Sequence, residues 1–140
     1  AIMYYIKSIM KNTIFKLTEY VYYISLLVLI ILYLFPGSLI GYFLYGNLDQ
    51  QPNLITNPIG TSINHLIFFS YITSLAIIVR LRIKSIFTSY KVILFFSGIL
   101  EFLHLIVPNR AFEMYDLVAN ITGVAIILII NSFIKWQKYL

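Results

Sequence analysis

Four long apolar segments, each flanked by short polar ones, limit what this chain can fold into. They cover about residues 18–35, 62–79, 91–107 and 114–133. An α-helix needs roughly 20 apolar residues to cross a hydrocarbon core of about 30 Å, and each segment approaches that length. Only 11% of the 140 residues are charged, whereas a soluble domain carries about 25%. We therefore predict an all-α integral membrane protein, a four-helix bundle in which residues 1–140 form a single transmembrane domain.

Residues 2–17, ahead of the first segment, have the pattern of an amphipathic helix. Their apolar and polar positions separate onto two faces at helical spacing; the apolar ones are Met3, Ile6, Met10, Ile14 and Leu17, and the polar ones are Lys7, Ser8, Lys11 and Asn12. This pattern predicts a basic interfacial helix on the membrane surface; the alternative is that residues 2–17 form the polar start of the first span. Between the first two spans we expect a short interfacial segment at 39–45 and a loop at 47–60.

The cations sort to one side of the predicted membrane. They precede the first span, surround the loop between the second and third spans, and follow the fourth; they are Lys7, Lys11, Lys16, Arg80, Arg82, Lys84, Lys91, Lys135 and Lys138. Arg110 is the single cation on the opposite side. Positive-inside sorting predicts a multi-pass protein with both termini cytoplasmic, in a bacterial inner (plasma) membrane. Because the cations lie at span ends rather than along one surface, nucleic-acid binding is disfavoured.

Ionisable and amide side chains interrupt the later spans near their outer ends. A charge in hydrocarbon costs roughly 2.5–3.5 kcal/mol on insertion scales, which makes each such residue a candidate functional site. The predicted topology brings six of them to one depth: His65, Glu101, His104, Arg110, Asp116 and Asn120. We expect Glu101 to pair with Arg110 or a protonated His65, and Asp116 to pair with Arg110. This cluster either locks the bundle together or forms a polar pocket open to the outer leaflet.

Two glycines share helix faces with these polar residues. Gly98 lies one turn from Glu101 in the third span, and Gly123 lies one turn from Asn120 in the fourth. Small residues let membrane helices approach closely. We therefore expect Gly98 and Gly123 to bring the third and fourth spans together.

The order of these residues resembles a known family signature. Along the chain the pattern reads His65, Glu101, His104, Pro108, Arg110, Asp116, Asn120 and Gly123. It is similar to the VanZ-like family of small four-span membrane proteins over most of residues 18–134, with His104 in place of a glutamine and Thr61-Ser62 in place of an Asp-Lys pair. The resemblance implies a cell-envelope protein without an established biochemical activity. The family is named for a member associated with resistance to teicoplanin, a glycopeptide antibiotic.

Enzymatic chemistry has little support in the sequence. Glu101 and His104 have the Glu-x-x-His spacing of helical metal sites, and His65 and Asp116 are candidates to complete a ligand set. Such sites normally contain further carboxylates or a second Glu-x-x-His, so we expect no metal and no other cofactor. The sequence also lacks nucleophile motifs and glycine-rich phosphate loops. We assign no catalytic residue and favour a non-enzymatic role, with ligand binding in the envelope or antibiotic resistance as the expected function.

A structural role is the alternative. A chain that is nearly all span has the character of an accessory subunit in a larger membrane complex. Its apolar faces would then contact other integral membrane subunits rather than lipid alone. The expected partners are membrane lipids in the first case and membrane subunits in the second.

Overall fold

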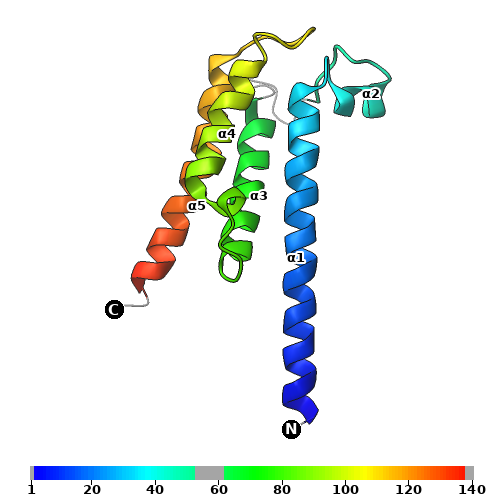
Figure 1. Ribbon diagram of the computed structural model, residues 1–140. Coiled ribbons are helices and arrows are strands. Elements are labelled where there is room, and N and C mark those ends of the chain that lie inside the picture. Colours follow the sequence, from blue (N-terminus) through cyan, green and yellow to red (C-terminus); the bar gives the residue numbers. More distant parts are fainter. Residues whose placement is uncertain (1, 53–61, 138–140) are drawn as a thin grey trace.

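The computed structural model describes residues 2–52 and 62–137, and these residues are helical apart from turns and loops (Figure 1). The elements are α1 (Ile2–Leu34), α2 (Leu39–Tyr45), α3 (Ser62–Arg80), the 3₁₀ turn η1 (Ile86–Thr88), α4 (Tyr90–Leu103) and α5 (Met114–Gln137). Three of the helices contain segments long and apolar enough to cross a membrane: Ile9–Leu34, Ser62–Arg80 and Met114–Gln137. The structure thus confirms an all-α chain with several candidate membrane spans.

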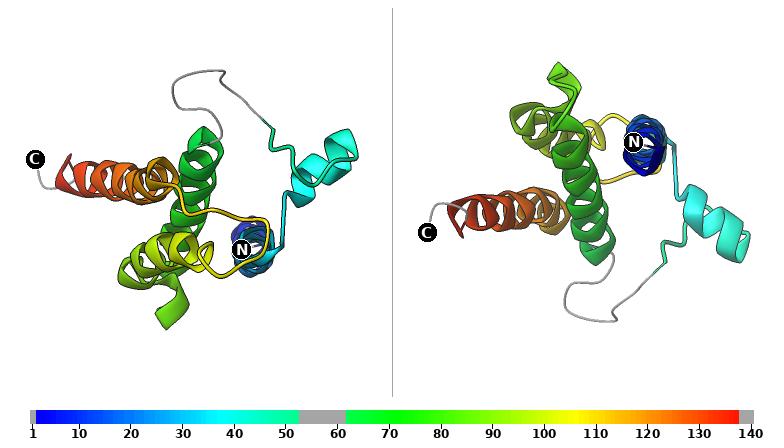
Figure 2. Two further views of the ribbon diagram at one scale, coloured as in Figure 1. Left: turned by 90° about the horizontal axis from the view of Figure 1, so that it is seen from above. Right: turned by 90° about the horizontal axis from the view of Figure 1, so that it is seen from below.

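Helix α3 lies among the other long helices. It packs most extensively on α5 and also contacts α1 and α4 (Figure 2). In Figure 1 α1 and α4 run upward, whereas α3 and α5 run downward, so that the start of α1 and the end of α5 lie toward the same end of the molecule. The buried apolar core lies where these helices meet; it includes Tyr22, Leu29, Phe69, Ile72 and Val124.

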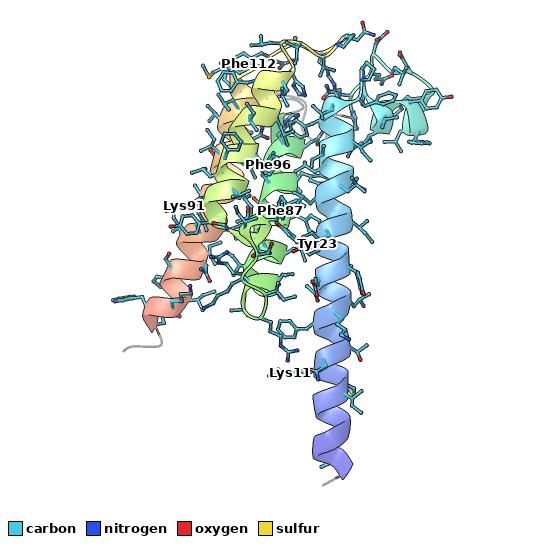
Figure 3. The ribbon with its side chains drawn as sticks, viewed as in Figure 1. Lys11, Tyr23, Phe87, Lys91, Phe96 and Phe112 are labelled. Atoms are coloured by element: carbon cyan, nitrogen blue, oxygen red, sulfur yellow. The ribbon has the colours of Figure 1, made fainter. Side chains whose placement is uncertain are left out.

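The expected interfacial helix and first span are one continuous helix, α1. The expected boundary near residue 17 is absent because residues 2–34 contain neither glycine nor proline, the residues that most readily interrupt a helix. The helix ends just before Pro36-Gly37, where Gly37 adopts a positive φ of 95°. The N-terminal half of α1 extends beyond the end of α3 (Figure 1), and Figure 3 labels Lys11 on this part of the helix.

The third predicted span, residues 91–107, is longer than the helix observed. Helix α4 ends at Leu103, and the amides of residues 104–106 bond three residues back instead of four. Pro108 is the physical reason, because its ring would clash with the carbonyl of His104 in a continuing α-helix. At 1.5 Å per residue, 14 residues extend about 21 Å, which is less than a hydrocarbon core.

The expected interfacial segment at 39–45 is the short helix α2. The Ser38 side chain caps its first turn by accepting from the Gly41 amide at 3.0 Å, and Gly46 ends it with a φ of 69°. Its outer surface is apolar, with Phe43 81% exposed. Residues 53–60 of the expected loop lie outside the described residues, as does Lys138 of the C-terminal basic segment.

Gly123 and Gly98 do not act as the expected pair. A Cβ on Gly123 would lie 2.5 Å from the carbonyl oxygen of Leu66, whereas a Cβ on Gly98 would meet nothing within 4 Å. Gly123 therefore allows α5 to approach α3, not α4, and the Ser70 hydroxyl donates to its carbonyl at 3.2 Å. The expectation that Gly98 is a close-packing position is wrong, because α4 places it next to open space.

These two glycines give a matched test of the helix contact. Gly123→Ala should lower the free energy of unfolding by about 1–3 kcal/mol, because the added methyl group must displace the backbone of α3. Gly98→Ala should instead be neutral or raise it by up to about 1 kcal/mol, because alanine is the better helix former. Unfolding in detergent–SDS mixtures measures both values. Equal effects of the two substitutions would contradict the close approach at Gly123.

Candidate functional site

Five of the six predicted polar residues converge near the upper end of the molecule in Figure 1. His65 comes from the start of α3, Glu101 and His104 from the end of α4, and Asp116 and Asn120 from the start of α5. Glu101 and Asn120 have no exposed surface, and His104 and Asp116 are buried. The alternation of helix directions produces this convergence, since it brings the ends of α1 and α4 to the starts of α3 and α5.

Tyr33, near the end of α1, joins the helices at the centre of this cluster. Its hydroxyl oxygen lies 2.6 Å from Asn120 Oδ1 and 2.6 Å from His65 Nδ1. Its ring stacks on His104 with centroids 5.3 Å apart. One tyrosine thus contacts polar side chains from α3, α4 and α5.

The hydrogen bonds around the Tyr33 hydroxyl show which atoms of Tyr33, Asn120 and His65 donate and which accept. The Asn120 amide nitrogen donates to the Ser97 carbonyl at 3.1 Å, so its oxygen faces Tyr33 and accepts the single hydroxyl proton. His65 must then donate its Nδ1–H to the Tyr33 oxygen. In the neutral ring, Nε2 is left with a lone pair.

That lone pair faces a carboxylate. His65 Nε2 lies 3.4 Å from Asp116 Oδ2, whereas the other carboxylate oxygen, Oδ1, accepts from the Ser62 hydroxyl. Two acceptors in contact repel each other unless a proton or another cation lies between them. The contact between His65 and Asp116 therefore requires a shared proton or another cation between the two atoms.

Glu101 and His104 hold a second shared proton. His104 Nδ1 lies 3.1 Å from Glu101 Oε1, and His104 Nε2 lies 3.1 Å from the Tyr33 carbonyl oxygen. Both nitrogens face acceptors, and a neutral imidazole has one N–H, so the second proton comes from an imidazolium or from the Glu101 carboxyl. In either form this pair carries no net charge, which suits its burial.

The two carboxylate oxygens of Glu101 have different hydrogen-bonding environments. Oε1 also accepts from the Glu113 amide at 3.1 Å, whereas Oε2 is buried without a hydrogen-bond partner among the described residues. The nearest recorded cationic group is His65, whose Nδ1 lies 3.9 Å from Oε2. A buried acceptor without a partner costs about 1–3 kcal/mol, so among the described residues this oxygen is a destabilising feature of the cluster unless another group satisfies it.

Arg110 does not form the expected ion pairs with Glu101 and Asp116. Its Nε and Nη2 groups donate to the carbonyls of Phe35 and Leu32, at 3.2 and 2.8 Å. These carbonyls lie at the C-terminal end of α1, where a helix dipole favours a cation and the last carbonyls lack helical partners. Burial lowers the pKa of the Arg110 guanidinium, although the nearby Glu101 carboxyl opposes this change.

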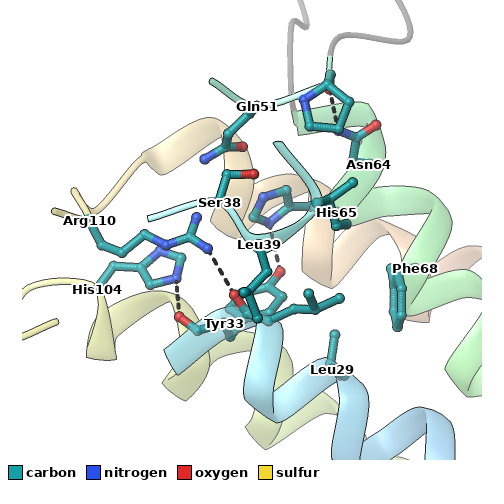
Figure 4. A pocket seen from close by; sticks show the side chains of 13 residues that line it. Leu29, Tyr33, Ser38, Leu39, Gln51, Asn64, His65, Phe68, His104 and Arg110 are labelled. Carbon is teal, nitrogen blue, oxygen red and sulfur yellow. Dashed lines mark hydrogen bonds between the residues drawn. The ribbon is translucent and has the colours of Figure 1, made fainter. Parts of the chain in front are cut away.

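A cavity of about 80 Å³ opens beside the cluster (Figure 4). Its polar lining comprises Tyr33, Ser38, Gln51, Asn64, His65, His104 and Arg110, and its apolar lining includes Leu29, Leu32, Leu39, Ile40 and Phe68. The cavity can hold several water molecules or a small polar group. It connects the buried cluster to the space between α1, α2 and α3.

Sequence reasoning missed three contributors to this site. Tyr33 is one of 12 tyrosines in the chain and lies in an apolar run, so composition does not distinguish it. Ser62 was predicted only as the first residue of the second span, where a serine does not indicate a carboxylate partner, and Ser97 contributes through its backbone carbonyl, which any residue type supplies. Only the position of Tyr33 at the outer end of the first span, level with the predicted cluster, was a usable signal.

Tyr33→Phe should destabilise the protein by about 2 kcal/mol or more. The substitution keeps the ring but leaves Asn120 Oδ1 and His65 Nδ1 without their shared partner. Tyr115, which is 77% exposed, provides the matched control, and Tyr115→Phe should have little effect. The comparison requires only the unfolding midpoints of both variants in detergent. Equal midpoints would contradict the bridging role of the Tyr33 hydroxyl.

Glu113, just outside α5, should give a measurable pH dependence. Desolvation beside the cluster raises the pKa of this carboxyl, and the charges of Asp116 and Glu101 raise it further. The folded protein then binds the proton more tightly than the unfolded chain, so the contribution of Glu113 to stability falls as pH rises above about 4.5. The stability of wild type relative to Glu113→Gln should therefore decrease from pH 4.5 to 7. A relative stability that increases over this range would contradict the raised pKa.

The comparisons with known proteins returned no match: no family model, curated protein or solved structure matches this chain. The resemblance to the VanZ-like family therefore rests on the positions of His65, Glu101, Arg110, Asp116 and Asn120 in the sequence. The geometry of the site, rather than a relative, has to carry the functional argument.

Proposed function

We propose that this chain is a VanZ-like protein of the cell envelope that binds an anionic amphiphile, a lipid with a phosphate-bearing headgroup, at the outer leaflet. The observation that carries the proposal is the cavity beside Arg110, in which apolar walls meet a polar, cationic lining. Apolar walls suit the chain of an amphiphile, and a guanidinium suits a phosphate. Resistance to a glycopeptide antibiotic stays an expectation of the family resemblance.

The proposal includes four crossings of the membrane with both termini cytoplasmic. Helices α3 and α5 run in the same direction (Figure 1), so the chain between them has to return across the bundle. It does so through η1, α4 and the turns at residues 104–107. The 3₁₀ turn η1 and the turns at residues 104–107 add length at the two ends of the short helix α4. The sorting of cations supports the orientation: Arg80, Arg82, Lys84 and Lys135 lie at the end opposite Arg110.

Within the part of the chain that the structure describes, Arg110 keeps N–H donors that no protein acceptor uses, as binding an anionic headgroup requires. A guanidinium has five N–H groups, and two of them are recorded as donating to the carbonyls of Leu32 and Phe35. The remaining groups lie at a cavity that also contains the side chains of Ser38, Gln51 and Asn64 (Figure 4). The two backbone bonds hold the guanidinium in place, so its free donors are preorganised for a ligand.

Native mass spectrometry of the purified protein can test this function. Wild type, incubated with equal amounts of phosphatidylglycerol and phosphatidylcholine, should retain the anionic lipid preferentially. Arg110→Gln should reduce that preference about tenfold, a change of about 1.4 kcal/mol. Arg82→Gln is the matched control, because Arg82 lies at the other end of the molecule, where it bonds Asn12.

A second variant separates ligand loss from misfolding. Leu39→Trp should fill the cavity and displace the lipid while keeping every charge of the site. Circular dichroism and gel filtration verify that both site variants are folded. Equal retention of the two lipids by wild type, or an unchanged preference in folded Arg110→Gln and Leu39→Trp, would overturn the proposed function.

A further inference from the structure

Three side chains of the cluster bring possible ligand atoms close together; those of Glu101 and Asp116 are buried, and that of His65 is partly exposed. Single ligand atoms from His65, Glu101 and Asp116 all lie within 4.8 Å of one another. Glu101 has no exposed surface, and its Oε2 has no hydrogen-bond partner among the residues that the structure describes. The hydrogen bonds described above also leave His65 Nε2 with a lone pair facing Asp116 Oδ2 at 3.4 Å. Three acceptor atoms thus lie near one another, and the nearest recorded nitrogen to Glu101 Oε2, His65 Nδ1, is beyond hydrogen-bond distance at 3.9 Å.

We propose that these three side chains form a site for one divalent transition-metal ion. The ligands would be His65 Nε2, Glu101 Oε2 and Asp116 Oδ2. The proposal goes beyond lipid binding, since it concerns the base of the cluster rather than the cavity at Arg110. It also differs from the Glu101-x-x-His104 site considered from the sequence, because His104 supports Glu101 instead of contributing a ligand.

Every proposed ligand is held by its other polar atom. Tyr33 holds His65 Nδ1, the Ser62 hydroxyl holds Asp116 Oδ1, and His104 with the Glu113 amide holds Glu101 Oε1. Metal sites in proteins have this arrangement, in which an outer layer of hydrogen bonds fixes the orientation of each ligand. The three remaining atoms are therefore already directed for coordination.

The donor set indicates the kind of ion. One imidazole nitrogen and two carboxylate oxygens suit Zn²⁺, Mn²⁺ or Fe²⁺, whereas Ca²⁺ and Mg²⁺ prefer oxygen ligands and Cu(I) prefers sulfur. Zinc bonds of about 2.0–2.2 Å place tetrahedral ligands roughly 3.4 Å apart, so ligand atoms that lie within 4.8 Å of one another need to move closer on binding. Three protein ligands also leave a fourth position open for water or another ligand.

Charge balance favours the same assignment. Without metal, His65 and Asp116 need a proton between them, as derived above. A proton between His65 and Asp116 leaves Glu101 Oε2 without a partner among the described residues. A divalent cation would replace that proton and would also satisfy Glu101 Oε2.

The test is metal binding by the full chain in lipid-free detergent. Purified protein stripped with a chelator is titrated with Zn²⁺ alone, and the ion retained after gel filtration is counted by elemental analysis. We expect one Zn²⁺ per chain. Co²⁺ as a separate probe should give the visible absorption of a four- or five-coordinate site. Because no lipid is present, the result is independent of whether the protein binds an anionic amphiphile.

Isosteric variants locate the site. Glu101→Gln and Asp116→Asn should weaken Zn²⁺ binding at least 100-fold, and Ser62→Ala should weaken it about 10- to 100-fold. Glu19→Gln and Asp49→Asn are matched controls that make the same chemical changes away from the cluster, Glu19 near Arg82 and Asp49 at an exposed position, and both should bind as wild type does. Circular dichroism verifies folding before each titration.

Two results would overturn the metal site. One is folded wild type that retains no stoichiometric Zn²⁺, Mn²⁺ or Fe²⁺ in separate titrations, which would show that protons alone occupy the cluster. The other is folded Glu101→Gln and Asp116→Asn protein that binds Zn²⁺ as tightly as wild type. If both variants fail to fold, Ser62→Ala decides the question, because unchanged Zn²⁺ affinity in that variant contradicts the supporting role of Ser62.

Discussion

Polar atoms buried between apolar helices have to satisfy one another, and this requirement organises the structure around Tyr33. Its hydroxyl lies between Asn120 on α5 and His65 on α3, and its backbone carbonyl accepts from His104 at the end of α4. Burying any one of these groups in hydrocarbon without a hydrogen-bond partner would cost several kcal/mol of free energy. The relative placement of the four helices is therefore fixed by directional bonds as well as by packing.

The protons of the cluster link this structural role to function. Glu101 with His104, and Asp116 with His65, each need one proton or an equivalent cation. Arg110 is separate from these pairs, since its recorded bonds go to the end of α1. Among the described residues the site thus has two parts: a compact base in which Glu101 Oε2 lacks a hydrogen-bond partner, and a cavity rim at which the Arg110 guanidinium keeps unused donors. We assign the metal ion to the first part and the anionic headgroup to the second.

The sequence predicted the helical class, most helix positions and five members of the cluster, because apolar runs and isolated charges are local signals. It failed where the outcome depended on three-dimensional contacts. Of the two alternatives for residues 2–17, the continuous helix α1 agrees with the polar start of the first span and not with a separate helix. The end of the third span was placed four residues too late, because the effect of Pro108 on the preceding turn was not taken into account.

Side-chain partners were the least predictable feature. Arg110 appeared to be the natural partner of two acids, but the carbonyls at the end of α1 offer it closer acceptors. Gly98 and Gly123 looked equivalent in sequence, yet only Gly123 faces a neighbouring backbone. The convergence of His65, Glu101 and Asp116 on one point depends on which oxygen of each acid is already bonded. No spacing rule contains that information.

A double-mutant cycle between α1 and α5 tests the central claim most directly. The unfolding free energies of wild type, Tyr33→Phe, Asn120→Ala and the double variant give the coupling between the two side chains. If the Tyr33 hydroxyl donates to Asn120 across the helix contact, the coupling should exceed about 0.6 kcal/mol, the average found for interhelical hydrogen bonds in a membrane protein. Additivity within about 0.3 kcal/mol would contradict the claim that shared polar contacts hold these helices together.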